Sequence, residues 1–125
     1  MTAFTLLLLS FLAITFLQSG YDKIVDWNGN VNWLKEHFSN TFLKNNVPAA
    51  LLTVLALEIA AGILGIMGII ENVLKQTTEL GNYCCIVSSV TLLLLLFGQR
   101  IAKDYDGART IVIYLIPALL GVYWL

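Results

Sequence analysis

Four long apolar stretches alternate with polar segments along this chain. Residues 1–21, 80–99 and 110–125 contain no Asp, Glu, Lys or Arg, and residues 47–70 contain a single acidic residue, Glu58. A helix needs about 20 apolar residues to cross the hydrocarbon core of a bilayer, which is about 30 Å thick. The pattern therefore predicts four transmembrane helices, over about residues 2–21, 48–70, 80–98 and 107–125.

The longest polar segment connects the first two predicted spans. Residues 26–30 (Asp-Trp-Asn-Gly-Asn) have the composition of a turn. Leu34, Phe38 and Phe42 then recur at every fourth residue, which places them on one helical face. We expect an amphipathic helix over about residues 31–43, lying at the membrane surface. The predicted fold is all-α, a single four-helix membrane domain with this interfacial helix between helices one and two.

Composition supports lipid as the solvent of this chain. Of its 125 residues, 58% are hydrophobic and only 12% are charged. The mean hydropathy is +0.82. A small soluble domain needs a more highly charged surface than this. The net charge of −1 gives no electrostatic reason to expect nucleic acid as a partner.

The distribution of positive charge predicts an orientation. Four spans place both ends of the chain on one side of the membrane and the two longer polar connections on the other. Those two connections carry Lys23, Lys35, Lys44, Arg100, Lys103 and Arg109, whereas the opposite side carries only Lys75. The positive-inside rule then places the two longer connections in the cytoplasm.

Glu58 is the first candidate for a functional residue. It follows Pro48 by ten residues, or about 15 Å of helix, which suggests a position near mid-bilayer. An ionisable group at that depth is a functional-site hypothesis by default. Gly62 and Gly65 lie on the same face and allow close helix approach, so we expect Glu58 to point into the bundle. The alternative is a structural carboxyl group that hydrogen-bonds to a serine at similar depth, such as Ser88.

A polar stripe at the end of the first span forms the second candidate. Gln18 and Asp22 are four residues apart, and so are Ser19 and Lys23 on the neighbouring strip. The stripe extends towards the expected position of Glu58. In the alternative interpretation, Lys23 simply extends its ammonium group to the lipid headgroups.

The connection after the third span holds further charged residues at the same membrane face. In one interpretation, Arg100 and Lys23 frame the mouth of a cavity whose floor is Glu58. Such an apolar slot would suit a quinone, a lipid or another amphipathic ligand. In the other, the connection is a solvated loop that also binds anionic headgroups.

The chain shows no recognisable catalytic set. It has one histidine, His37, without a second cluster of metal ligands. The adjacent Cys84 and Cys85 are expected to act as small apolar residues. It has neither a phosphate-binding glycine loop nor a nucleophile elbow. We expect no catalytic residue, no metal and no intrinsic cofactor.

Several of these features together resemble the DoxX family of small bacterial membrane proteins. Residues 19–23 (Ser-Gly-Tyr-Asp-Lys) close the first span, and Pro48 opens the second. Glu58 is followed by Gly62, and residues 97–105 resemble a connection found in a Bacteroidota subgroup of the family. The four-span layout extends this resemblance over nearly the whole chain.

The resemblance implies a location and a function. The location is the bacterial inner membrane, with both chain ends in the periplasm under the orientation above. The function is that of a non-catalytic subunit or adaptor of a quinone-linked redox complex, partnered by other membrane subunits or by copies of itself. Family members include a small subunit of a thiosulfate:quinone oxidoreductase and a mycobacterial protein associated with thiol-stress enzymes. Only Gly20, Lys23 and Glu58 carry over as family positions.

Two other functions stay open. The chain could bind or carry a quinone or lipid around Glu58, Lys23 and Arg100. It could also be a quinone-linked oxidoreductase in its own right, which would require a cofactor supplied from elsewhere.

Overall fold

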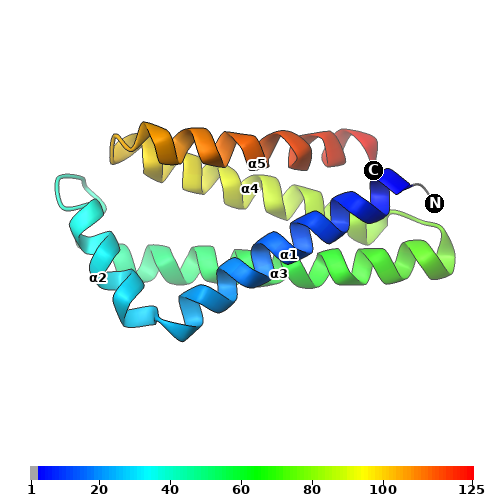
Figure 1. Ribbon diagram of the computed structural model, residues 1–125, viewed down its shortest axis with the longest axis horizontal. Coiled ribbons are helices and arrows are strands. Elements are labelled where there is room, and N and C mark those ends of the chain that lie inside the picture. The colour runs from blue at the N-terminus through cyan, green and yellow to red at the C-terminus, as the bar shows by residue number, and fades with distance from the viewer. Residues whose placement is uncertain (1–2) are drawn as a thin grey trace.

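Five helices make up the computed structural model, which describes residues 3–125 (Figure 1). They are α1 (Ala3–Val25), α2 (Trp27–His37), α3 (Val47–Lys75), α4 (Glu79–Ile101) and α5 (Tyr105–Trp124). α1, α3, α4 and α5 are long and apolar enough to cross a membrane. The predicted all-α bundle with four spans and a short helix between the first two is therefore confirmed. Residue 2, where the first span was predicted to begin, lies outside the described residues.

The four long helices pack side by side. α1 crosses α3, α3 packs on α4, and α4 packs on α5 (Figure 1). α2 runs across one end of the bundle, and the two chain ends lie together at the opposite end. There the ring centroids of Phe4 and Trp124 are 5.8 Å apart. Both chain ends thus share one end of the bundle, as four consecutive crossings require.

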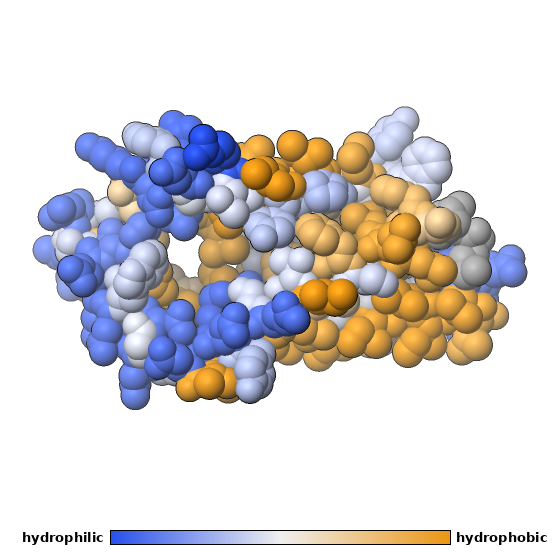
Figure 2. Space-filling model, in the orientation of Figure 1, coloured by the Kyte–Doolittle hydropathy of each residue, from blue (hydrophilic) through white to orange (hydrophobic). Residues whose placement is uncertain are grey.

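Apolar side chains occupy both the interior and most of the outer surface of the long helices. Leu9, Leu12 and Phe16 of α1 and Leu92 of α4 are buried in the core. Many other large apolar side chains point outward, and Figure 2 shows that hydrophilic residues gather at the end that carries α2. A soluble monomer rarely exposes so large an apolar surface. The fold is that of a small multi-pass membrane protein.

Glycines bring α3 close to its neighbours. A Cβ atom on Gly65 would lie 3.2 Å from the Cβ of Ala13 in α1. A Cβ atom on Gly68 would lie 2.9 Å from the Cα of Gly81 in α4. Small residues at these crossings allow the backbones to approach, which maximises van der Waals contact where lipid offers no hydrophobic driving force.

The short helix begins at Trp27, not at about residue 31 as the sequence pattern suggested. The segment 26–30 therefore belongs mostly to a helix and not to a turn. Asn30 explains the difference, because its side-chain amide donates to the carbonyl oxygens of Asp26, at 2.7 Å, and Asp22, at 3.4 Å. These bonds satisfy carbonyl groups at the junction, so that α2 follows α1 almost directly.

The short helix also ends earlier than residue 43, at His37. Beyond it the chain forms turns, in which the Thr41 hydroxyl donates to the carbonyl of Phe38 and accepts from the amide of Leu43. Such local side-chain bonds compete with helix formation. Phe42, expected on the apolar face of the helix, lies beyond its end and is exposed.

The remaining apolar face of α2 packs against the start of α3. Leu34 and Phe38 contact a small buried cluster of Val31, Val47 and Leu51. This contact holds α2 across the end of the bundle.

Candidate functional site

A buried ion pair joins α1 to α3. The Lys23 Nζ lies 2.8 Å from the Glu58 Oε1, and the side chain of Glu58 is only 2% exposed. The same Nζ donates to the Ser19 hydroxyl at 2.7 Å. The structure thus brings together three of the residues singled out in the sequence: Ser19, Lys23 and Glu58.

Gly20 allows this meeting. A Cβ atom at Gly20 would lie 2.7 Å from the Ile59 Cδ1, so the end of α1 packs directly against α3 beside Glu58. Ala13, near the middle of α1, lies opposite Gly65. Glu58 is therefore level with the last turns of α1. The first turns of α3 extend past the end of α1 and run beside α2.

Burial makes the pairing necessary. An isolated charge is costly to remove from water, and a carboxylate at this site needs a cation beside it. Lys23 fulfils that need from the last turn of α1. The pair also leaves the site with no net charge.

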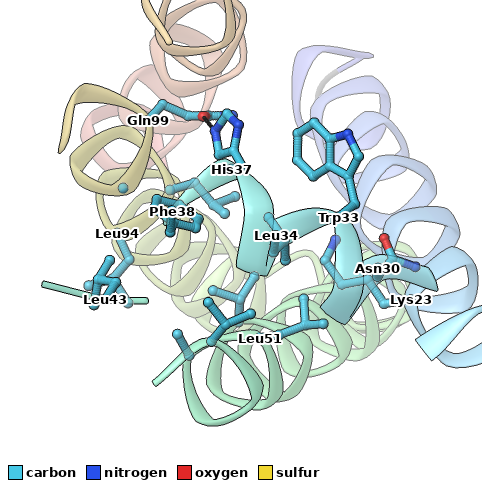
Figure 3. A pocket seen from close by; sticks show the side chains of 15 residues that line it. Lys23, Asn30, Trp33, Leu34, His37, Phe38, Leu43, Leu51, Leu94 and Gln99 are labelled. Atoms are coloured by element: carbon cyan, nitrogen blue, oxygen red, sulfur yellow. Dashed lines mark hydrogen bonds between the residues drawn. The ribbon is translucent and has the colours of Figure 1, made fainter. Parts of the chain in front are cut away.

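A cavity of about 280 Å³ adjoins Lys23. It lies between α2 and the neighbouring turns of α3 and α4 (Figure 3). Figure 2 shows the molecule hollowed at this end, between the polar residues of α2 and the apolar residues of the long helices. Apolar side chains form most of its wall, among them Trp33, Leu34, Phe38, Leu51 and Leu94.

Polar groups reach the cavity from three helices. Lys23 comes from α1, Asn30 and His37 from α2, and Gln99 from α4. The His37 Nε2 lies 2.9 Å from the Gln99 Oε1 and 3.7 Å from the Asp104 Oδ2. Together these contacts connect α2 to the far side of the cavity.

An aromatic surface borders the same space. The rings of Trp33 and His37 stack with centroids 4.6 Å apart and an angle of 17° between their planes. Phe38 meets His37 edge-on at 5.0 Å.

Sequence reasoning did not assign Asn30, Trp33, His37 and Gln99 to this site. The signal available was that the two polar connections that hold these residues lie on the same side of the membrane. His37 was considered only as a metal ligand. Its actual neighbour Gln99 is 62 positions away in the sequence, and no local pattern reports that contact.

Four predicted residues lie outside this constellation. Gln18 and Asp22 are exposed, and the Arg100 guanidinium lies 5.3 Å from the ring centroid of Tyr105 and does not line the cavity. Ser88 is buried against Cys84, with 3.9 Å between Oγ and Sγ. Within residues 3–125, no hydrogen bond joins Ser88 to Glu58. The structure thus places Lys23, but not Arg100, at the cavity.

Both cysteines are buried in the core. The Cys84 thiol donates to the Ala61 carbonyl at 3.2 Å, and the two thiols are free. In residues 3–125, no group of three His, Cys, Asp or Glu side chains converges as a metal site would require.

The arrangement is suited to binding an amphipathic molecule. An ammonium group held in a neutral pair offers a hydrogen bond at the edge of an apolar space, and aromatic rings offer flat contact surfaces. The chain itself is a small polytopic membrane protein. Comparisons with protein-family models, curated proteins and solved structures find no match to it.

Proposed function

We propose that this protein binds an amphipathic small molecule, of quinone or lipid type, with its polar head in the cavity beside Lys23. The observation that carries this proposal is that Lys23, the partner of the buried Glu58, lies at the wall of an apolar cavity. A pair that served packing alone would not need to border open space.

The size and place of the cavity support this proposal. Pockets for small ligands have volumes of about 300–1,000 Å³. At about 280 Å³ the cavity suits a head group alone. A long apolar tail would lie along the apolar surface of the spans, as it does in a bilayer. The cavity lies at the end of the bundle where polar residues begin, which is the level an amphipathic molecule prefers.

Extraction with a mild detergent tests the proposal. Mass spectrometry of the purified protein should show a retained quinone or lipid, and Glu58→Gln should reduce its amount. Glu36→Gln is the matched control, since Glu36 is exposed on α2 and does not line this cavity. Absence of any retained amphipathic molecule from the native and both variant proteins would contradict the proposal.

A second candidate is a non-catalytic subunit or adaptor of a quinone-linked membrane redox complex. Gly20, Lys23 and Glu58, the positions that the resemblance to the DoxX family carries over, meet at one contact between α1 and α3. This convergence favours membership of that family. Gentle purification from native bacterial inner membranes should then yield larger redox subunits together with this chain. Recovery of this chain alone, as a monomer or homo-oligomer, would argue against it.

A further inference from the structure

We infer that the head group bound in this cavity is an uncharged ring with hydrogen-bond acceptors, not an anionic phosphate, and that Gly98 leaves room for it. The inference rests on the proposed binding function and specifies its ligand.

The charge balance of the site is the first step. Lys23 is the cation at the cavity wall, and Glu58 lies 2.8 Å from it. The other polar groups of the lining come from Asn30, His37 and Gln99. The two amides carry no charge, and the His37 ring faces the Asp104 carboxylate at 3.7 Å, so it has an acidic neighbour of its own. An anionic head would enter beside a carboxylate that already compensates the only lysine present. A neutral head avoids that repulsion and keeps the buried pair intact.

The available hydrogen bonds are the second step. An ammonium group has three N–H donors. Lys23 donates one of them to the Ser19 hydroxyl, and Glu58 lies beside the same ammonium group as its ion-pair partner. Among residues 3–125, no other hydrogen bond from the Lys23 ammonium group is found, so it keeps a donor for a ligand. A carbonyl oxygen on a ring is an acceptor that can use it.

The shape of the wall is the third step. Trp33 and His37 form a stacked aromatic pair, and the ring of Phe38 stands beside them. Flat rings favour offset stacking or edge contacts with another ring. Figure 3 shows Trp33 and Lys23 on the same side of the cavity. A planar head could therefore contact Trp33 while its acceptor lies near the ammonium group.

The absence of a side chain at Gly98 is the fourth step. A Cβ atom there would lie 3.5 Å from the Phe38 Cζ and 3.8 Å from its Cε1, which is ordinary contact. At Gly68, by contrast, it would lie 2.9 Å from the backbone of α4. Helix packing thus requires the glycine at position 68 but not at 98. Gly98 has no positive φ angle either. Gly98 lines the cavity, and its missing side chain leaves space there.

Fluorescence of Trp33 provides the assay. The protein with Trp27→Phe and Trp124→Phe keeps Trp33 as its only tryptophan. A benzoquinone with a short isoprenoid tail should quench this emission saturably in detergent or nanodiscs. Short-chain phosphatidylglycerol should not displace the quinone. A protein that keeps only Trp124, the last residue of α5, is the control for quinone that partitions into the detergent, because the C-terminal end of α5 lies at the opposite end of the bundle from α2 (Figure 1).

Two substitutions test the assigned features. Gly98→Leu should weaken quinone binding at least tenfold, and Gly98→Ala should weaken it less. A thermal melt of each variant shows whether it is folded. Glu58→Gln removes the negative charge and should shift the preference towards phosphatidylglycerol at least tenfold, which a purely structural role for Glu58 would not produce.

The outcomes separate the inference from the function on which it rests. Phosphatidylglycerol binding in competition with the quinone, or Gly98→Ala and a folded Gly98→Leu binding as the native protein does, would overturn the inference and leave the proposed function standing. Failure of both probes to bind, together with no retained molecule after extraction, would overturn the proposed function itself.

Discussion

The Lys23 Nζ lies 2.8 Å from the Glu58 Oε1, across the contact between the last turn of α1 and the buried face of α3. This pair is the only contact within 4.0 Å between side chains of opposite charge on different long helices in residues 3–125. Its importance for the fold can be measured apart from any ligand.

Removing one partner of the Lys23–Glu58 pair should lower the free energy of unfolding more than removing both. Lys23→Met or Glu58→Gln alone leaves a buried group without its partner, and breaking a buried pair costs about 3–5 kcal/mol. The double variant leaves no unpaired charge, so its melting temperature should lie above that of the less stable single variant. Thermal unfolding in detergent measures this. Strictly additive losses in the double variant would show that the two side chains do not interact.

Gly68→Ala should destabilise the bundle. The new methyl group would lie 2.9 Å from the backbone of Gly81, which cannot move aside as a side chain can. Overpacking of this kind costs about 1–3 kcal/mol. Gly98→Ala is the matched control on α4, since its methyl group finds ordinary contact distances, and it should melt at or above the native temperature. Equal stability of the two variants would contradict the close approach of α3 and α4.

Asp104→Ala should weaken the start of α5. The Asp104 carboxylate accepts a hydrogen bond from the amide of Gly107 at 2.9 Å, and loss of such a cap costs about 1 kcal/mol. Asp106→Ala is the control, because its ion pair with Arg109 is fully on the surface and such pairs contribute little. Hydrogen exchange of the first turns of α5 should rise for Asp104→Ala alone. Similar exchange in both variants would show that the cap has no effect.

The native cysteines should not react with a maleimide in the folded protein. Cys84 and Cys85 each have 0% exposure, so labelling should require unfolding. Tyr83→Cys provides the contrast, since position 83 is 56% exposed. Its thiol should react under native conditions with an apolar maleimide that enters the detergent micelle. Rapid labelling of the native pair would contradict the packing of α4 in the core.

The ends of the short helix α2 could not be predicted from local residue spacing. Leu34 and Phe38 were correctly placed on its packed face, but the same spacing extended the helix to Phe42. Thr41 ends that extension through its own hydrogen bonds, and Asn30 moves the start of the helix forward. These are competing local interactions of similar strength, so residue spacing alone could not decide between them.

The sequence by itself determined the four spans and the inward position of Glu58. A chain in lipid must satisfy its backbone within each helix, so apolar length specifies the spans, and the glycines that follow Glu58 mark the face that packs. Only the tertiary structure decided that Lys23 is its partner rather than a serine of α4, that Arg100 lies apart, and that His37 meets Gln99 across a cavity. Those outcomes depend on how far α3 extends past α1 and on how α2 folds back over the bundle. Such offsets are set by side-chain packing between distant segments, and no periodicity within one segment records them.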